Sequence, residues 1–182
     1  MRSLFLALVL AGLPALAGAP FALSSKDLVP DTAMPAKHVF KGMGCDGGNL
    51  SPHLAWTDPP PGTRSFVVTA YDPDAPTGSG WWHWVVYNLP ATARELPTGA
   101  GSGKGALPAG AVQGRTDFGA VGYGGACPPP GDKPHRYFFT VTALKVDRLD
   151  VPADATAAYV GFMTNANKLA QASLTVTFGR AK

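Results

Sequence analysis

Two aspartates and a histidine stand close together in this 182-residue sequence and are the first candidates for chemistry. Asp72 and Asp74 lie in the run Asp72-Pro-Asp-Ala-Pro76, directly after an apolar stretch, and His83 enters the next apolar stretch. If the chain stays extended through both prolines, the two carboxylates point to the same side. Taken singly, Asp-Pro-Asp is typical of a turn, and a histidine in a strand is commonly a hydrogen-bonded core residue.

A second histidine and a tyrosine open another apolar stretch. His135-Arg136-Tyr137 directly follows the loop Cys127-Pro-Pro-Pro-Gly-Asp-Lys-Pro134. Two imidazoles, a phenol and loop amides would form a donor-rich pocket, which suits an oxyanion such as phosphate. Aspartates beside the rings would keep a proton on each ring nitrogen, so that both imidazoles donate. We therefore expect Asp72 to act through His83 or His135, and anion affinity to rise as the pH falls from about 8 toward 6.

The same residue types leave two other kinds of site open. Two histidines with two aspartates would also suit zinc or a first-row metal, although no His-x-x-x-His or His-Glu-x-x-His spacing occurs. An Asp–His pair could activate a hydrolytic nucleophile, but the chain has no Gly-x-Ser-x-Gly motif, and Ser51 and Ser79 are the nearest candidates. We expect a non-enzymatic pocket without metal or cofactor. We assign His38 and His53 to ordinary surface or loop positions.

Strands are the elements expected to position these residues. The chain holds 22 Gly and 18 Pro, and all its acidic residues except Glu95 are Asp, which disfavours long helices. Runs of β-branched and aromatic residues predict strands over 65–71, 82–88, 136–145 and 173–178. The first two runs are continuously apolar, so they should be central and covered on both faces, whereas the fourth alternates and should have one wet face. Weaker strands are predicted around 37–40 and 54–56.

One helix is predicted between the last two strong strands. Asp154 can cap its start, and apolar residues recur at spacings of three and four through Ala158, Tyr159, Phe162, Met163, Ala166 and Leu169. The Gly- and Pro-rich region 99–131 is predicted to form long loops over the sheet, and loops of that length are commonly functional. The fold class is therefore mostly β, in a single domain.

The N-terminus has the pattern of a secretory signal peptide. Met1-Arg2 is a short basic start, 4–13 is an apolar run, and Ala15-Leu16-Ala17 offers small residues for cleavage after Ala17. The run is too short to span a bilayer, although an uncleaved anchor is the alternative. We expect residues 18–182 to form the mature domain, periplasmic or secreted, without stable membrane insertion. Basic residues are scattered and the formal charge is only +3, so nucleic-acid binding is not expected.

Cys45 and Cys127 lie in separate Gly-rich segments. In an exported chain an even number of cysteines favours a disulfide, and Cys45–Cys127 is the pairing we expect. The two cysteines are 82 residues apart, and closing a loop of that length stabilises a fold by roughly 4 kcal/mol in the chain-entropy model. Two unpaired thiols are the alternative.

Several motifs, taken in order, resemble the phosphatidylethanolamine-binding protein (PEBP) family, and most of all its bacterial YbhB/YbcL or Raf kinase inhibitor-like branch. The motifs are Ser51-Pro-His-Leu-Ala-Trp56, Pro61-Gly-Thr-Arg-Ser-Phe66, Asp72-Pro-Asp-Ala-Pro76, Trp82-His83, Gly122-Tyr-Gly-Gly and Pro134-His-Arg-Tyr137. The resemblance extends from about Asp27 to Arg180. It implies a PEBP-like fold: a central antiparallel Greek-key sheet, a smaller flanking sheet and a C-terminal helix.

The resemblance also implies a small anion pocket at one end of that sheet. The residues that match the family's signatures are Asp72, Asp74, His83, His135 and Tyr137, with Pro76 at the rim and the Cys127 backbone amide beside the anion. The ligand is expected to be a small anion or a phospholipid head group. Little follows Phe178, so the pocket should be more open than in vertebrate members, which close it with a longer C-terminal helix.

Two further roles stay open. The long loops over 99–131 could contact a protein partner, for example a protease or another enzyme that the chain inhibits. Relatives often dimerise, so a homodimer is also possible. Kinase regulation belongs to eukaryotic relatives and is not transferred to a chain with a secretion signal.

Overall fold

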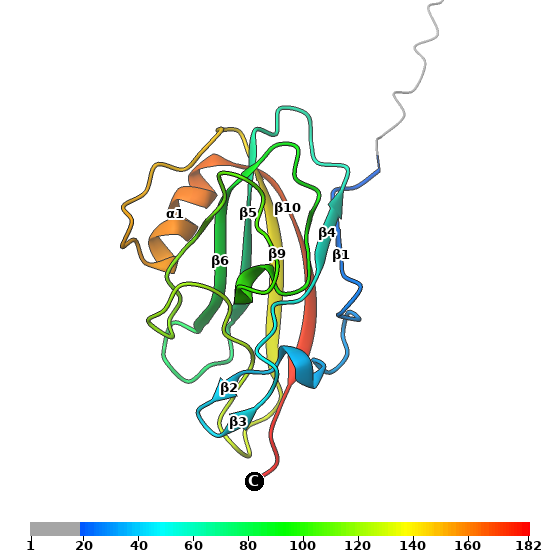
Figure 1. The fold of residues 1–182 in the computed structure, drawn as a ribbon, viewed down its shortest axis with the longest axis vertical. Coiled ribbons are helices and arrows are strands. Elements are labelled where there is room, and N and C mark those ends of the chain that lie inside the picture. The colour runs from blue at the N-terminus through cyan, green and yellow to red at the C-terminus, as the bar shows by residue number, and fades with distance from the viewer. Residues whose placement is uncertain (1–18) are drawn as a thin grey trace, which may run out of the picture.

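A five-stranded antiparallel sheet forms the frame of the structure, a computed structural model that describes residues 19–182. The predicted signal peptide, 1–17, lies outside the described residues. The order β10-β9-β5-β6-β8 is built from β5 (Ser65–Asp72), β6 (Trp81–Pro90), β8 (Val112–Gln113), β9 (His135–Leu144) and β10 (Lys168–Phe178) (Figure 1). Because β9 returns to pair with β5 on the side away from β6, four of these strands form a Greek key, as expected.

Smaller elements flank this sheet. A three-stranded sheet has the order β1-β4-β7, with β1 (Ala22–Ser24), β4 (Leu54–Thr57) and β7 (Glu95–Leu96). A short hairpin pairs β2 (Lys41–Gly42) with β3 (Cys45–Asp46), and the α-helix is α1 (Ala157–Asn167). In Figure 1, α1 lies on one side of the large sheet and β1 with β4 on the other. No helix within 19–182 is long and apolar enough to cross a membrane.

Strand β5 is buried on both faces. Phe66 and Val68 belong to the core that includes Trp56 of the small sheet, whereas Val67 belongs to a second core that includes Val160 of α1. Side chains of a strand alternate between the two faces of the sheet, so a strand between two cores needs apolar residues at every position. The prediction of two central strands covered on both faces is therefore confirmed.

Most strand predictions are confirmed, but one is wrong. The weak strand predicted around 37–40 is replaced by a 3-10 turn over Ala36–His38, in which the His38 amide donates to the Pro35 carbonyl. The other weak strand is present as β4, and β10 begins before the predicted 173. The region 99–131 does form long loops, interrupted by a 3-10 turn over Ala100–Ser102 and by β8.

The helix differs from its prediction in its cap and its buried face. Thr156, not Asp154, is the N-cap, and its side chain accepts from the Tyr159 amide. Ala157, Val160 and Thr164 are buried, whereas Tyr159 and Phe162 are 45% and 69% exposed and Leu169 belongs to β10. The expected apolar stripe was therefore only partly right: Met163 packs against the core beneath the helix, but Tyr159 and Phe162 face outward.

A buried polar cluster around Asp27 fixes the N-terminal segment. Its carboxylate accepts hydrogen bonds from Lys37 Nζ, Thr98 Oγ1 and the His53 amide. His38 is fully buried with its Nε2 4.0 Å from the Asp27 carboxylate, and His53 is 6% exposed. The surface assignment of both histidines is wrong, because folding buries them beside the Asp27 carboxylate, although His53 does lie in the loop before β4.

The N-terminal segment also covers part of the last strand. The Asp31 and Met34 amides donate to the carbonyls of Thr175 and Thr177, and the Thr177 amide donates to the Thr32 carbonyl. These bonds occupy the outer edge of β10 near its C-terminal end. Segments from opposite ends of the chain therefore lie side by side.

Candidate ligand-binding site

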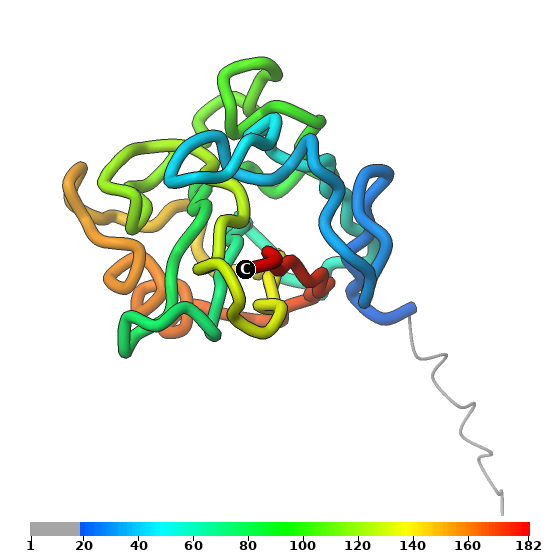
Figure 2. The backbone as a smooth tube through the Cα atoms, turned by 90° about the horizontal axis from the view of Figure 1, so that it is seen from below, coloured from blue at the N-terminus to red at the C-terminus, as the bar shows by residue number. Residues whose placement is uncertain are grey.

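A pocket of about 240 Å³ lies where β5 ends and where β6 and β9 begin. Since β5 runs antiparallel to both neighbours, its last residue lies beside their first residues. The lining residues are Met43, Asp72, Ala75, Pro76, Thr77, Trp81, His83, Phe118, Cys127, Pro128, Pro129, His135, Tyr137 and Arg180. Figure 2 views the molecule from this end, with the C-terminal segment at the centre of the surrounding loops. Six of the seven expected site residues line this pocket, and Asp74 does not.

Asp72 orients one histidine, as its position at the strand end suggested. One carboxylate oxygen lies 2.8 Å from His135 Nδ1, and the other accepts from the Asp74 amide at 2.8 Å. Asp72 and His135 are 3% and 4% exposed. The pair therefore holds the ring in one orientation, with Nδ1–H donating to the carboxylate.

His83 is oriented by a backbone carbonyl instead of a carboxylate. Its Nδ1 lies 2.8 Å from the Gly124 carbonyl, which can only accept, so Nδ1 carries the proton. Burial lowers the pKa of His83, which favours the neutral ring. In that form Nε2 is an acceptor, and this buried atom has no hydrogen-bond partner in residues 19–182. The expectation that aspartates make both imidazoles double donors therefore does not hold for His83.

Tyr137 packs against His83 and offers the complementary group. The two rings meet edge to face, with centroids 5.2 Å apart. Burial, with a smaller contribution from Asp72, raises the pKa of Tyr137, so its hydroxyl stays protonated and can donate. That hydroxyl is also buried and unpartnered among the described residues. A neutral acceptor and a neutral donor therefore stand unsatisfied in the wall of one pocket.

Asp74 stabilises the start of β9 outside this pocket. Its two carboxylate oxygens accept from Arg136 Nη2 at 2.7 Å and Nε at 2.9 Å, and these bonds lower the pKa of Asp74 to about 2. The Asp74 amide bonds back to the Asp72 carboxylate, so the chain turns here. The expectation of an extended run with both carboxylates on one side is wrong for this reason.

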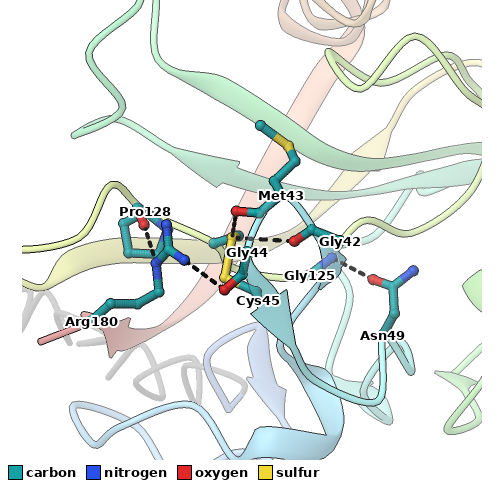
Figure 3. The surroundings of a disulfide bond; sticks show 9 residues. Gly42, Met43, Gly44, Cys45, Asn49, Gly125, Pro128 and Arg180 are labelled. Carbon is teal, nitrogen blue, oxygen red and sulfur yellow. Dashed lines mark hydrogen bonds between the residues drawn. A yellow bond between two sulfur atoms is a disulfide. The ribbon is translucent and has the colours of Figure 1, made fainter.

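The pocket rim contains a disulfide that joins Cys45 to Cys127, and the predicted pairing is confirmed. Figure 3 shows Arg180 beside it. Arg180 Nε donates to the Pro128 carbonyl at 2.7 Å, and Nη1 donates to the Gly44 carbonyl at 2.9 Å. Sequence reasoning missed Arg180, whose only signal was a basic residue shortly after the last strand.

Potential metal ligands do not converge in the described part of the chain. No group of three His, Cys, Asp or Glu side chains in 19–182 is arranged to hold a metal ion. Ser51 and Ser79, the nucleophiles considered above, do not line the pocket. Ser51 Oγ accepts from the Gly101 amide instead.

Comparison with known proteins gives one consistent family. The family model described as "Phosphatidylethanolamine-binding protein" matches residues 24–179. The chain is 60% identical to the UPF0098 protein YbhB of Escherichia coli K12 over 156 residues, which cover 86% of this chain and 98% of that protein. It is 52% identical to the UPF0098 protein YbcL of the same organism over 180 residues, 98% of each chain.

Solved structures agree with the sequence matches. The crystal structure of Escherichia coli YbcL, described as a new member of the mammalian PEBP family, has a TM-score of 0.85 and 53% identity, covering 88% of this chain and 99% of that one. A putative PEBP homologue, CT736 from Chlamydia trachomatis, has a TM-score of 0.73 and 31% identity, covering 88% and 97%.

Proposed function

Because the chain belongs to the phosphatidylethanolamine-binding protein family, we propose that it is an exported, non-enzymatic binding protein whose pocket takes a phosphate-type anion. The anion is either a free small molecule or the head group of a phospholipid. The proposal gives Asp72, Pro76, His83, Cys127, His135 and Tyr137 a ligand-binding role.

The unsatisfied pair formed by His83 Nε2 and the Tyr137 hydroxyl carries this proposal. Leaving a buried polar group without a partner costs about 1–3 kcal/mol, which a ligand can restore. A phosphate monoester that keeps one proton has both an acceptor oxygen for Tyr137 and a P–OH donor for neutral His83, whereas a phosphodiester head group has no P–OH and would need the protonated ring as its donor. Phosphomonoesters lose their second proton near pH 6, so this form is available close to neutral pH.

Binding is favoured over catalysis by the state of the hydroxyl and thiol groups in the pocket wall. Thr77 donates its hydroxyl to the Gly80 carbonyl, and Cys127 is held in the disulfide. Tyr137 has a raised pKa, which makes its hydroxyl a donor and not a nucleophile. These contacts favour holding an anion over attacking a substrate.

The pocket dimensions favour a small ligand. A volume of about 240 Å³ is below the range of roughly 300–1,000 Å³ that drug-sized ligands occupy. Trp81, Phe118 and Pro76 give the pocket an apolar wall beside its polar groups. This combination suits a phosphate with a short organic substituent.

Export is supported by the N-terminal sequence together with the disulfide. Disulfides persist in oxidising compartments, and the Cys45–Cys127 bond joins segments 82 residues apart. We propose a periplasmic or secreted protein, cleaved near Ala17. A homodimer and a protein partner at the loops over 99–131 stay predictions.

Two buried tyrosines provide a crossed test. In isothermal titration calorimetry, Tyr137→Phe should bind inorganic phosphate and phosphoethanolamine at least ten-fold more weakly, because it lacks the hydroxyl that donates to the ligand. Its stability should be unchanged, because the Tyr137 hydroxyl has no partner among the described residues. Tyr123→Phe should bind normally but lose about 1 kcal/mol of stability, because the Tyr123 hydroxyl donates to the His38 carbonyl. Equal binding by both variants would contradict the proposal.

Histidine variants test the same site. His83→Ala and His135→Ala should each weaken phosphate binding ten-fold or more, whereas His38→Ala and His53→Ala should leave the affinity of the folded protein unchanged. Metal analysis of the purified protein is the matching test against a metalloenzyme. Stoichiometric zinc that resists dialysis and is lost in His83→Ala would overturn the proposal.

A further inference from the structure

The charges around the pocket leave a phosphate-type anion without an obvious cation among the expected residues. Asp72 is acidic and is bonded to His135. Burial lowers the pKa of His83, so this ring favours its neutral form. Among the lining residues, Arg180 has the one side chain whose positive charge is fixed near neutral pH.

The guanidinium of Arg180 is only partly satisfied. Two of its five N–H groups donate to the Pro128 and Gly44 carbonyls, which are neutral. No ion pair in the described part of the chain includes Arg180, whereas Arg64 and Arg136 are paired with Asp147 and Asp74. Three N–H groups therefore have no partner among the described residues, on a charged side chain that lines the pocket.

The position of this guanidinium is fixed by the disulfide. Gly44 directly precedes Cys45 and Pro128 directly follows Cys127, so the bond that joins the cysteines also holds the two carbonyls in place (Figure 3). A Cβ at Gly44 would lie 3.2 Å from Arg180 Nη1, which shows how closely the backbone approaches the side chain. A donor group held in place before binding loses little conformational entropy when the ligand arrives.

We propose that Arg180 binds the ligand's anionic oxygens directly and supplies the positive charge of the pocket. This inference rests on the proposed function, that the pocket takes a phosphate-type anion. The planar guanidinium suits phosphate because it can present two parallel N–H donors to two oxygens. Arg180 then donates to the negatively charged oxygens of the phosphate, while His83 and Tyr137 form hydrogen bonds with its other oxygens.

Titration calorimetry of matched charge variants tests this role. Arg180→Gln should bind inorganic phosphate ten-fold or more weakly, since a charge-assisted hydrogen bond contributes about 1.5–3 kcal/mol. Arg180→Lys should recover only part of the affinity, because it restores the charge and not the planar pair of donors. Lys182→Gln removes the same charge from an exposed position in the same segment and should change affinity less than two-fold.

The comparison of ligands separates free phosphate from a lipid head group. Glycerophosphoethanolamine carries the diester of a head group, whereas inorganic phosphate has no organic substituent. Arg180→Gln should weaken the binding of both ligands. The ligand that the wild-type protein binds more tightly shows whether the natural ligand is free phosphate or a lipid head group. If the wild-type protein binds neither, the proposed function fails. If wild type binds and Arg180→Gln binds equally well, the role of Arg180 alone is overturned.

A measurement on the wild-type protein keeps the test decisive if the variants do not fold. In a ¹H–¹⁵N spectrum of arginine side chains, phosphate should shift the Nε resonance of Arg180 and leave that of Arg94 unchanged. Arg94 is a suitable reference because it also donates to carbonyls, of Ala91 and Ala93, but does not line the pocket. A saturating phosphate titration that leaves the Arg180 signal unmoved would refute the inference.

Discussion

Asp72 and Asp74 are two residues apart and have different roles. Asp72 is buried against His135, whereas Asp74 holds Arg136 at the start of β9. We expect Asp72→Asn to weaken phosphate binding about ten-fold, although it removes a negative charge from the proposed anion site, because His135 loses the carboxylate that orients it. Asp74→Asn is the matched control, and calorimetry should find its affinity within two-fold of wild type. Tighter phosphate binding by Asp72→Asn would show that this carboxylate only repels the anion.

His83 should couple anion binding to proton uptake. In the protein without ligand, burial lowers the pKa of His83 below its ordinary value of 6.5. A bound anion favours the charged ring and raises that pKa again. Affinity for sulfate, which keeps its charge over this range, should therefore strengthen as the pH falls and level off only below the lowered pKa of the free ring. This places part of the rise at lower pH than the sequence suggested.

Calorimetry in two buffers with different ionisation enthalpies measures the protons taken up. Besides His83, the charged and titratable groups that line the pocket are Asp72, His135, Tyr137 and Arg180. Asp132 lies 3.6 Å from His135 Nε2, and Asp117 also acts on His83, so some proton uptake can persist without His83. His83→Gln, which does not titrate, should take up fewer protons than wild type. Equal uptake by the two proteins would contradict the assignment of the proton to His83.

Helix α1 illustrates how a regular apolar pattern can identify an element and still mislead about its buried face. Val160 is 1% exposed and belongs to the core beneath the helix, whereas Phe162 is 69% exposed. We expect Val160→Ala to lower the free energy of unfolding by about 1–3 kcal/mol and Phe162→Ser to change it by less than about 0.5 kcal/mol. Urea unfolding measures both. A larger loss in Phe162→Ser would show that the helix packs through its outer face.

Strands were easier to predict than the turns between them. The runs that became β5 and β6 are apolar at most positions, on both faces of the strand, because both faces are buried, so the sequence itself shows their place in the sheet. The turn over Ala36–His38 has no such signal, since its form depends on local hydrogen bonds after Pro35. The start of β10 was missed because its first residues are exposed and pair with β9 through a register shift between Lys168 and Ala170.

The pocket was predictable to the extent that strand ends bring its residues together. Asp72, His83 and His135 meet because they stand at the ends of neighbouring antiparallel strands. Arg180 was missed because its position depends on contacts with segments that are distant in sequence. Asp74 was misplaced because its position depends on one tight turn after Asp72. Such contacts leave no periodic pattern in a sequence.

At the scale of the whole molecule, the disulfide joins strand β3 to a loop, and its two cysteines are 82 residues apart in sequence. The variant Cys45→Ser/Cys127→Ser should lose roughly 4 kcal/mol of unfolding free energy in the chain-entropy model, measured by urea unfolding. Reductant should have the same effect on wild type and none on the variant. Titration of wild type with a thiol reagent, denatured but not reduced, should find no free thiol, and two thiols per chain would refute the pairing.

Asp27 should make the fold sensitive to acid. Burial alone would raise the pKa of Asp27, but hydrogen bonds from Lys37, Thr98 and His53 outweigh burial and lower the pKa well below its usual 3.8. The carboxylate therefore adds stability that is fully present above the unfolded value of 3.8 and is lost as the pH falls toward the lower folded value.

Acid unfolding curves compare wild type with Asp27→Asn. The variant should be less stable by about 1–3 kcal/mol near neutral pH, because charged hydrogen bonds are lost, and the difference should shrink below about pH 4. Thermal unfolding at several pH values measures this. A difference that does not depend on pH would mean that the charge of Asp27 contributes nothing.

The side-by-side position of the segment near Asp31 and the end of β10 sets an order of folding. During synthesis the N-terminal segment emerges first, but its bonds to Thr175 and Thr177 must wait for nearly the whole chain. The pocket has the same dependence, since the Arg180–Gly44 bond spans 136 residues. Contacts so distant in sequence close slowly, so folding should fall in the millisecond-to-second range typical of β proteins. The proposed ligand pocket should therefore be among the last parts of the molecule to assemble, and a chain that lacks its last strand should not bind phosphate.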